Sequence, residues 1–412
     1  MRVDARRATR LIALAAALGL LARLAFGLIY WVDKPLTHDE REYLSLALSL
    51  QNGRGFVYAE ADQPGTGQRF GRAPGYPLFL AAIGAATGHA ESTPPRVKVA
   101  QSILGGLIVW IIGLLAIRAG GPGPGVAAAG LAAVYPPFVW MPAYVLSETL
   151  YSLAALSTAL ALQAAVDRAV AHDIREAGPL ALLAGGLAGS AVLIRPGMLF
   201  FLPLAAIWLI ARRRRVLVVA LLASAIAVIA PWTVRNLGEH GRLVLVSTTG
   251  GVNFWIGNHP LARGEGDMAA NPDIKRAELE FRRAHPGLTA DELEPLYYRD
   301  ALDHIAQRPG WWLGLLARKA FHTILPFGPS HAVHSTRYRV ASAASYLAVL
   351  PFAVAGGRRL WSSARRPAAL FLLAASAMLS CLVFFPQERY RIPEIDPTLI
   401  VCAGALAGRV RP

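Results

Sequence analysis

Long apolar blocks are the feature that most constrains the fold of this chain. The 412-residue sequence repeatedly runs through mainly apolar residues before a short group of Arg, Pro, Gly or His interrupts it. Many of these blocks approach the roughly 20 residues that a helix needs to cross a bilayer. Hydrophobic residues make up 55% of the chain and charged residues only 16%, so a water-soluble fold would expose too much apolar surface. The sequence therefore predicts an all-α protein that crosses a membrane many times.

Positive charges indicate how the chain is oriented in that membrane. A formal net charge of +15 would suggest nucleic acid as a partner if the protein were soluble. The arginines gather between apolar blocks instead, as on the cytoplasmic flanks of membrane helices, so we expect a membrane and no nucleic acid as the surroundings. The groups are Arg6, Arg7 and Arg10; residues 212–215; Arg358, Arg359, Arg365 and Arg366; and Arg409 and Arg411.

The apolar blocks and the arginine groups together predict about ten crossings. Two cytoplasmic groups must be separated by an even number of crossings, and this condition limits which blocks can cross. Both termini are then cytoplasmic, in a bacterial-type inner membrane. Two short Pro-flanked stretches, 74–90 and 311–327, break the parity if either crosses alone, so we interpret both as interfacial or re-entrant helices. The expected crossings are 11–32, 99–118, 122–138, 145–166, 180–194, 196–211, 216–234, 340–357, 368–385 and 392–408.

Two long polar segments, 33–98 and 235–310, are expected on the extracytoplasmic side, and function is expected there. The first contains an amphipathic pattern over 39–51 that predicts a helix. The second contains helical patterns over 277–284 and 291–308, separated by Pro and Gly. The two cysteines lie inside apolar blocks, so they indicate neither a disulfide framework nor a metal site.

Three acidic residues are candidates for chemistry. Asp39 and Glu40 follow the first crossing, where a carboxylate can act as a base toward an acceptor hydroxyl or amine. The alternative for Asp39 is that, with His38, it only caps its helix. Glu148 begins a crossing, and an ionisable group near membrane depth is a functional candidate. The alternative for Glu148 is a structural ion pair with Arg195.

Four arginines lie where the positive-inside rule does not place them and therefore need an anionic partner. These are Arg72, Arg195, Arg389 and Arg391. Because guanidinium groups bind phosphate through two parallel hydrogen bonds, a phosphate ligand fits them. For Arg72, snorkelling at the membrane interface is the alternative. The segment 250–258 offers amide and aromatic groups for a polyol, or equally a tight turn that packs.

In chain order, these motifs resemble the GT-C membrane glycosyltransferases of the protein mannosyltransferase and aminoarabinose transferase superfamily. Each motif is weak alone, but the ordered set covers nearly the whole chain. The motifs are His38-Asp39-Glu40 with Tyr43, Arg72-Ala-Pro-Gly-Tyr-Pro-Leu, Tyr135-Pro, Ser147-Glu148-Thr149, Arg195-Pro196, Asn253 with Gly257-Asn258, and Arg389-Tyr390-Arg391-Ile-Pro393.

The resemblance implies a GT-C-like bundle with extracytoplasmic juxtamembrane helices and a catalytic carboxylate in the first outer loop. It implies transfer of a hexosyl or pentosyl group from a polyprenyl-phosphate-linked sugar to a lipid, glycan or protein acceptor, with inversion. Asp39 and Glu40 are then the catalytic candidates, and the four arginines are the candidates for the donor phosphate. The implied substrate-binding residues are Tyr43, Glu148, Asn253, Asn258 and Tyr390.

Two questions stay open at the level of sequence. No cofactor is required, although a divalent metal held by Asp39, Glu40 and Glu148 is an alternative way to neutralise the phosphate. A transporter or lipid flippase is the rival class, because permeases also combine many crossings with a few buried charges. Transporters place those charges at the bilayer midplane, whereas here they gather at the outer ends of the crossings.

Overall fold

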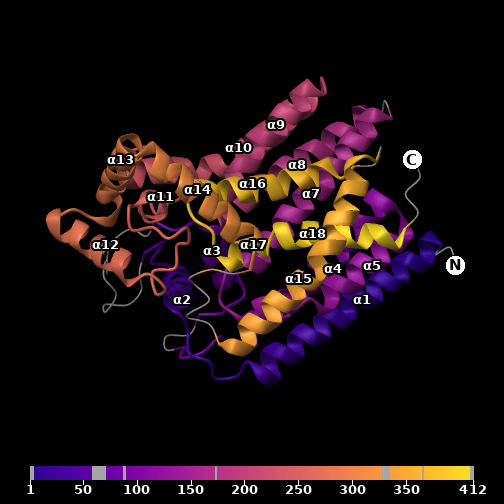
Figure 1. Ribbon diagram of the computed structural model, residues 1–412, viewed down its shortest axis with the longest axis horizontal. Helices are drawn as coiled ribbons and strands as arrows, with labels where there is room; N and C mark the ends of the chain where they lie inside the picture. The colour runs from indigo at the N-terminus through magenta and orange to yellow at the C-terminus, as the bar shows by residue number, and fades with distance from the viewer. Residues whose placement is uncertain are drawn as a thin grey trace.

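The computed structural model describes residues 4–57, 71–86, 90–171, 174–326, 328, 335–363 and 366–408, which leaves Arg365, Arg409 and Arg411 of the arginine groups outside. Within these residues the chain is a bundle of helices with no strand longer than a single bridge (Figure 1). All ten segments predicted to cross the membrane are helical. Their helices are α1 Ala5–Ala25, α4 Pro95–Gly120, α5 Pro122–Val134, α7 Glu148–Val170, α8 Ile174–Ile194, α9 Phe201–Ala211, α10 Arg215–His240, α15 Thr336–Trp361, α16 Ala368–Val383 and α18 Ile395–Gly404.

Six of the described helices are long and apolar enough to cross a membrane: α1 with its π-helical continuation Phe26–Tyr30, α4, α7, α8, α10 and α15. A seventh crossing results if α5 and the bent segment after it, which starts with α6 Pro136–Trp140, count as one broken span. The helices α9, α16 and α18 are apolar but shorter. The protein is therefore a polytopic membrane bundle, and the count of ten crossings stays a prediction.

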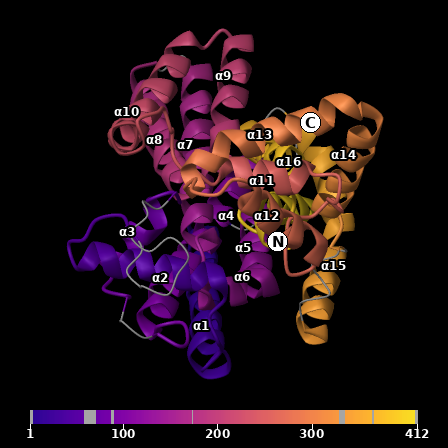
Figure 2. The same cartoon turned by 90° about the vertical axis from the view of Figure 1, so that its left-hand side faces the viewer.

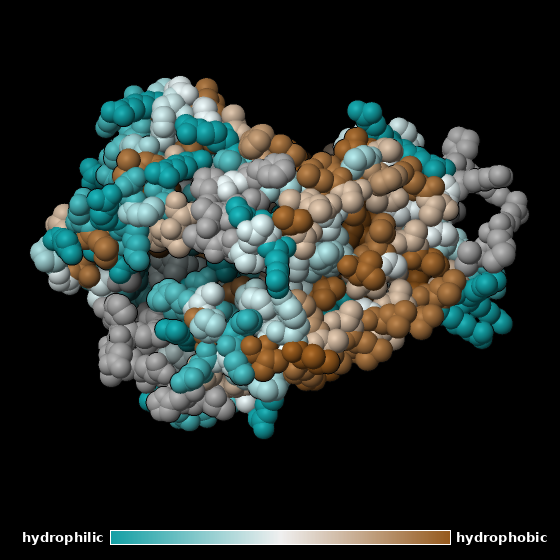
Figure 3. All heavy atoms as spheres, turned by 60° about the horizontal axis from the view of Figure 1, so that its bottom comes forward, coloured by the Kyte–Doolittle hydropathy of each residue, from teal (hydrophilic) through white to brown (hydrophobic). Residues whose placement is uncertain are grey.

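The helices of the two predicted outer segments, together with α14 and α17, gather at one end of the bundle, which we call the pocket end, while the two chain termini lie at the opposite, terminal end (Figures 1 and 2). On the face that Figure 3 shows, brown, apolar side chains lie between more hydrophilic ends. This is the distribution expected of a body that contacts lipid around its waist and water at both ends. The helices gathered at the pocket end are α2 His38–Gln51, α3 Gly75–Ala82, α11 Gly250–Asn258, α12 Pro272–Ala284, α13 Ala290–Gln307, α14 Pro309–Ile324 and α17 Glu388–Arg391.

Small residues allow the long helices to approach closely. Gly185 and Gly189 of α8 face Leu221 and Ala225 of α10, and an added Cβ would lie 2.2 Å and 2.8 Å from the carbonyl oxygens of those residues. Glycine is therefore required at both positions for this contact. Such small-residue interfaces are how membrane helices gain van der Waals contact where lipid removes the hydrophobic driving force.

Helix α2 confirms the amphipathic helix predicted over 39–51, but the predicted cap is wrong. The N-cap residue is Thr37, and its backbone N–H donates to Glu40 Oε2 at 2.8 Å in a capping box. His38 and Asp39 lie inside the helix. The carboxylate of Asp39 is consequently available for contacts elsewhere.

The predicted interfacial segments are also helical, as α3 and α14, and neither is among the described helices that are long and apolar enough to cross. Helices α12 and α13 confirm the two helical patterns of the second loop. Together with α11 and α14 they enclose a separate small core around Trp255, which is 1% exposed. This core holds α11 against the pocket described next.

Candidate active site

A cavity of about 220 Å³ opens at the pocket end, where segments far apart in sequence converge. Its walls come from α2, the loop before α3, the start of α7, the junction between α8 and α9, the approach to α11, and the segment from α16 to α18. The lining includes most of the predicted site residues: Asp39, Tyr43, Arg72, Glu148, Arg195, Asn253, Arg389 and Tyr390.

Two arginines hold the carboxylate of Asp39. Arg72 Nη2 donates to Asp39 Oδ1 at 2.9 Å, and Arg389 Nη2 donates to Asp39 Oδ2 at 2.7 Å. The first arginine comes from the loop before α3 and the second from α17, 350 positions along the chain from Asp39. The pocket therefore ties the first outer loop to the end of the chain.

A second carboxylate lies beside the first. Glu148 Oε1 is 2.7 Å from Arg195 Nη1 and 3.8 Å from Arg389 Nε. The other oxygen, Oε2, is buried and has no hydrogen-bond partner among the described residues. The ion pair with Arg195 that the sequence offered as an alternative does exist, yet both partners line the cavity.

These contacts join six side chains of alternating charge, which we call the charge ladder. It runs Glu42, Arg72, Asp39, Arg389, Glu148 and Arg195. Three negative groups balance three positive groups, so an anionic ligand that binds one of these arginines competes with the carboxylates already paired with it.

The arginines also set the protonation of Asp39. Burial raises the pKa of this carboxyl, but the charges and hydrogen bonds of Arg389 and Arg72 outweigh burial and hold the pKa well below its usual range. Asp39 is therefore an anion at neutral pH. It is also a weak base for as long as both arginines remain in place.

Two tyrosines support the guanidinium groups through cation–π contacts. The Arg72 guanidinium lies 4.8 Å from the centre of the Tyr43 ring. The guanidinium groups of Arg195 and Arg389 lie 4.6 Å and 5.4 Å from the centre of the same Tyr390 ring. The tyrosines predicted from the resemblance thus position the arginines.

Three of the predicted site residues do not line this cavity. Glu40 is 2% exposed and accepts hydrogen bonds from the backbone N–H groups of Thr37 and Val145. Arg391 is buried and donates to Asp396 Oδ1 at 2.7 Å. Asn258 is buried and all of its polar atoms are bonded, with Trp312 and Lys319 both donating to its Oδ1 at 3.0 Å. Each of these side chains links elements of the fold.

Sequence reasoning missed several residues of the wall. Tyr151 donates to Glu394 Oε1 at 2.7 Å, and both residues line the cavity. Glu394 could have been found, because it directly follows the Arg389 to Pro393 motif at the start of an apolar block. Ser247, Thr249 and Ser380 add hydroxyl groups to the wall, and single serines and threonines carry no sequence signal of that kind.

The described residues do not fit a metal ion. Within the described ranges, no group of three or more His, Cys, Asp or Glu side chains is placed to hold one. Both oxygens of Asp39 already accept hydrogen bonds from arginines, which repel a cation.

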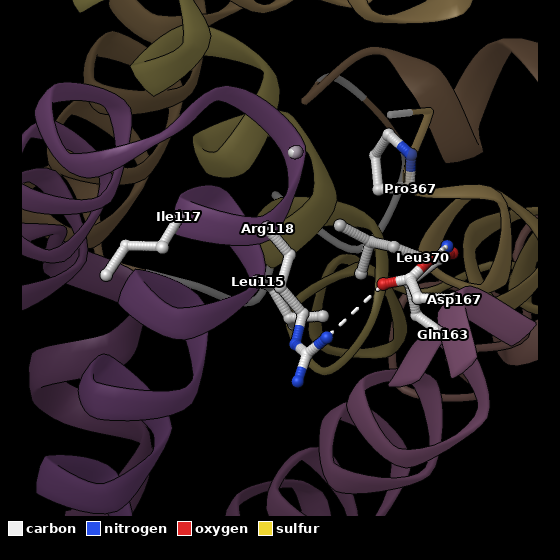
Figure 4. A pocket seen from close by; sticks show the side chains of 8 residues that line it. Leu115, Ile117, Arg118, Gln163, Asp167, Pro367 and Leu370 are labelled. Carbon is white, nitrogen blue, oxygen red and sulfur yellow. Dashed lines mark hydrogen bonds and ion pairs between the residues drawn. The ribbon is translucent and has the colours of Figure 1, made fainter. Parts of the chain in front are cut away.

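A second cavity, of about 340 Å³, lies at the terminal end between α4, α7 and the start of α16 (Figure 4). Its charged groups pair with each other, since Arg118 Nη1 lies 3.2 Å from Asp167 Oδ2. Gln163 donates to the other oxygen of Asp167 at 2.9 Å. Asp167 is thus paired with Arg118, whereas Asp39 is held by two arginines.

Solved structures share the architecture of the bundle. The oligosaccharyltransferase of Archaeoglobus fulgidus, in complex with Zn and sulfate, superposes with a TM-score of 0.56 at 14% identity, over 96% of this chain and 48% of that one. The chain has a GT-C-like membrane fold. The same enzyme, AglB, in complex with an inhibitory peptide and a dolichol-phosphate gives a TM-score of 0.52 at 14% identity, over 97% of this chain and 50% of that one.

ArnT from Cupriavidus metallidurans, bound to undecaprenyl phosphate, aligns with 97% of this chain and 77% of its own at 17% identity and a TM-score of 0.40. This chain spans about half the length of AglB. No protein-family model and no curated protein sequence matches it.

Proposed function

We propose that this protein is a glycosyltransferase that moves a hexosyl or pentosyl group from a polyprenyl-phosphate donor to a lipid, glycan or protein acceptor on the extracytoplasmic side of the inner membrane. The observation that supports this most is the pairing of one carboxylate, Asp39, with two arginines in a cavity at the hydrophilic end of an apolar bundle. In this proposal a base and a phosphate site share one cavity at the end of the bundle, where a lipid headgroup would meet it.

The proposed reaction is a direct displacement. Asp39 takes the proton of an acceptor hydroxyl or amine, and the freed electron pair forms a bond to the anomeric carbon of the donor. The bond from that carbon to the phosphate oxygen breaks, and its electron pair leaves with the prenyl phosphate. Arg389 and Arg195 stabilise the negative charge on this leaving group. Attack from the face opposite the phosphate inverts the anomeric centre.

The position of the charges favours an enzyme over the rival transporter. Asp39, Arg72 and Arg389 lie on α2, the loop before α3 and α17, all of which are outside the long helices. A transporter would be expected to hold such charges on broken helices at mid-depth. The polar cavity at one end instead suits a headgroup that reacts there.

The proposal is tested with purified protein in detergent or nanodiscs and a panel of radiolabelled polyprenyl-phosphate sugars. We expect one donor to release prenyl phosphate, and we expect Asp39→Asn to lower the turnover by about 10²-fold or more, the scale of general-base catalysis. Asparagine keeps the size of the side chain but cannot take a proton at neutral pH.

Glu40→Gln is the matched control, because it neutralises the neighbouring acid without touching the cavity. It should lower thermal stability, since it weakens contacts to Thr37 and Val145, while the folded fraction keeps its turnover. Normal turnover in Asp39→Asn would show that Asp39 is not the catalytic base. Release of prenyl phosphate from no donor in the panel, together with transport of one of them, would favour the rival class.

A further inference from the structure

The contacts of Asp39 conflict with its proposed role. Each of its oxygens accepts a hydrogen bond from a guanidinium, at 2.9 Å from Arg72 and 2.7 Å from Arg389. A base must instead turn an oxygen toward the acceptor and hold a proton there. Both guanidinium groups stabilise the Asp39 anion, so the departure of either arginine before transfer would make Asp39 a stronger base.

The two arginines differ in how firmly they are held. Arg72 also forms an ion pair with Glu42, and its guanidinium lies against the Tyr43 ring. Both of these partners are on α2, the helix that carries Asp39, so the Arg72 side chain makes three contacts with that one helix.

Arg389 comes from a different element, the four-residue helix α17. Besides its bond to Asp39, it donates a hydrogen bond to Gln387 on the same short segment, at 2.8 Å. Glu148 is more distant, at 3.8 Å. Tyr390, whose ring supports Arg389, is on the same short helix, so Arg389 can exchange partners without moving a larger element.

An anion in the cavity offers Arg389 a better partner than Asp39. Arg195 Nη1 and Arg389 Nε lie 2.7 Å and 3.8 Å from the same oxygen, Glu148 Oε1, so the two guanidinium groups are close enough to contact one phosphate. A phosphate group offers more acceptor oxygens and more charge than a carboxylate, and bidentate contacts to arginine are among the strongest charged hydrogen bonds.

We propose that Arg389 is a switch operated by the donor: it pairs with Asp39 before the donor binds and transfers to the donor phosphate afterwards, which leaves Asp39 with Arg72 alone. This inference rests on the proposed function. Loss of Arg389 removes the strongest influence that lowers the pKa of Asp39, so Asp39 becomes a better base only when a sugar phosphate is present. Acceptors or water that enter without a donor then meet an inactive carboxylate.

Competition for Arg389 gives the switch a measurable signature. We would measure the affinity of undecaprenyl phosphate for the wild type, Asp39→Asn, Arg389→Gln and the double variant in nanodiscs. Because Asp39 no longer competes, Asp39→Asn should bind this anion at least about five-fold more tightly than the wild type does. In the Arg389→Gln background the same substitution should change the affinity less than about two-fold. The neutral alcohol undecaprenol should show no such pattern.

Glu42→Gln is the matched control. It also removes one negative charge from the charge ladder, but through Arg72 and not through Arg389. Any change that it causes in the affinity should be the same with Arg389 present or replaced by Gln. Asp39→Ser provides a second neutral variant if Asp39→Asn proves unstable in a thermal melt.

The outcomes separate the switch from the proposed function. If undecaprenyl phosphate binds and the effects of Asp39→Asn and Arg389→Gln on affinity are additive, the switch is wrong and the transferase proposal stands. The switch is also wrong, and the transferase proposal stands, if the affinity for undecaprenyl phosphate is unchanged or weaker in both Asp39→Asn and Asp39→Ser. If undecaprenyl phosphate does not bind the wild type, both proposals are overturned.

Discussion

The first turns of α2 show how adjacent acids take different roles. Successive helical residues point about 100° apart, so Asp39 faces the cavity while Glu40 turns back to cap the helix. The sequence left open whether Asp39 is only a cap. The pattern Thr37-His38-Asp39-Glu40 matches a capping box, in which the acid at the third helical position binds the N-cap backbone. That local pattern is sufficient to assign the capping role to Glu40 and to leave Asp39 for other contacts.

The arginines on either side of Tyr390 should behave differently when each is replaced. Arg389→Ala should weaken the binding of undecaprenyl phosphate by about 1.5–3 kcal/mol, the value of one hydrogen bond to a charged group. Arg391→Ala should instead lower the free energy of unfolding by about 3–5 kcal/mol, because it leaves the buried Asp396 without its ion-pair partner. Binding measurements and denaturation of both variants in the same nanodiscs test the difference.

Replacing Asp396 with Asn in the Arg391→Ala background is the control for that prediction. The double variant should regain part of the lost stability, since no unpaired buried charge remains. If Arg391→Ala folds as well as the wild type and loses donor affinity, then Arg391 contacts the phosphate as the sequence predicted.

At the scale of elements, the packing of α11 against the end of α16 shapes one wall of the cavity. Gly257 of α11 faces the carbonyl of Phe384, where an added Cβ would lie 1.9 Å from the oxygen. Asn258 fixes the same contact by donating to the Val383 carbonyl at 3.0 Å. For the segment 250–258, the sequence indicated packing as one of two alternatives. It did not indicate that the segment packs against the end of α16.

Gly257→Ala should therefore destabilise the fold and distort the cavity. Since the obstruction is a backbone carbonyl, which cannot rotate away as a flexible side chain can, we expect a loss of about 1–3 kcal/mol in unfolding free energy. Gly314→Ala in α14 is the matched control, because nothing lies within 4 Å of its added Cβ. It should be neutral or stabilising by up to about 1 kcal/mol. Equal thermal melts for the two variants would contradict this packing.

The small core of α11 to α14 should be sensitive to acid through His259. Burial, and next the nearby His304, lower the pKa of His259 from 6.5 to about 4, and its Nδ1 accepts a hydrogen bond from the Leu261 N–H. The unfolded chain therefore takes up a proton before the folded one does. The stability from the neutral ring is complete above pH 6.5 and is lost as the pH falls toward 4.

Thermal melts between about pH 7.5 and 4.5 test this effect. His259→Gln should lose less stability over that interval than the wild type loses, because glutamine does not titrate. A pH dependence that is identical in the wild type and His259→Gln would show that this ring does not couple folding to pH.

At the scale of the whole molecule, the sequence predicted the helical segments better than it predicted their contacts. Apolar blocks and arginine groups are local signals, so every expected crossing is found as a helix. The charge ladder depends on α2 meeting α17, and Asp39 and Arg389 are 350 positions apart, a contact that no local pattern records. The motif resemblance brought Asp39, Arg72 and Arg389 into one expected site without showing that they touch.

The orientation of the bundle is the prediction that links its architecture to its proposed chemistry. If the arginine groups are cytoplasmic, residues 212–215 between α9 and α10 face the cytoplasm and the cavity faces away from it. Arg263 lies in the loop before α12 at the pocket end, with a side chain that is 52% exposed. Single cysteines at Arg263 and Arg213 therefore report on opposite sides. The native Cys381 and Cys402 are both buried, and labelling of the unsubstituted protein measures any background from them.

An impermeant maleimide added to intact cells should label Arg263→Cys and leave Arg213→Cys unlabelled until the membrane is permeabilised. The substitution at position 213 leaves three neighbouring arginines, so the charge that sets the orientation is retained. If both cysteines were labelled in intact cells, the number of crossings between positions 213 and 263 would be even, which contradicts the single crossing predicted there. Labelling of Arg213→Cys alone would place the cavity in the cytoplasm, where a donor displayed on the outer leaflet could not reach Asp39.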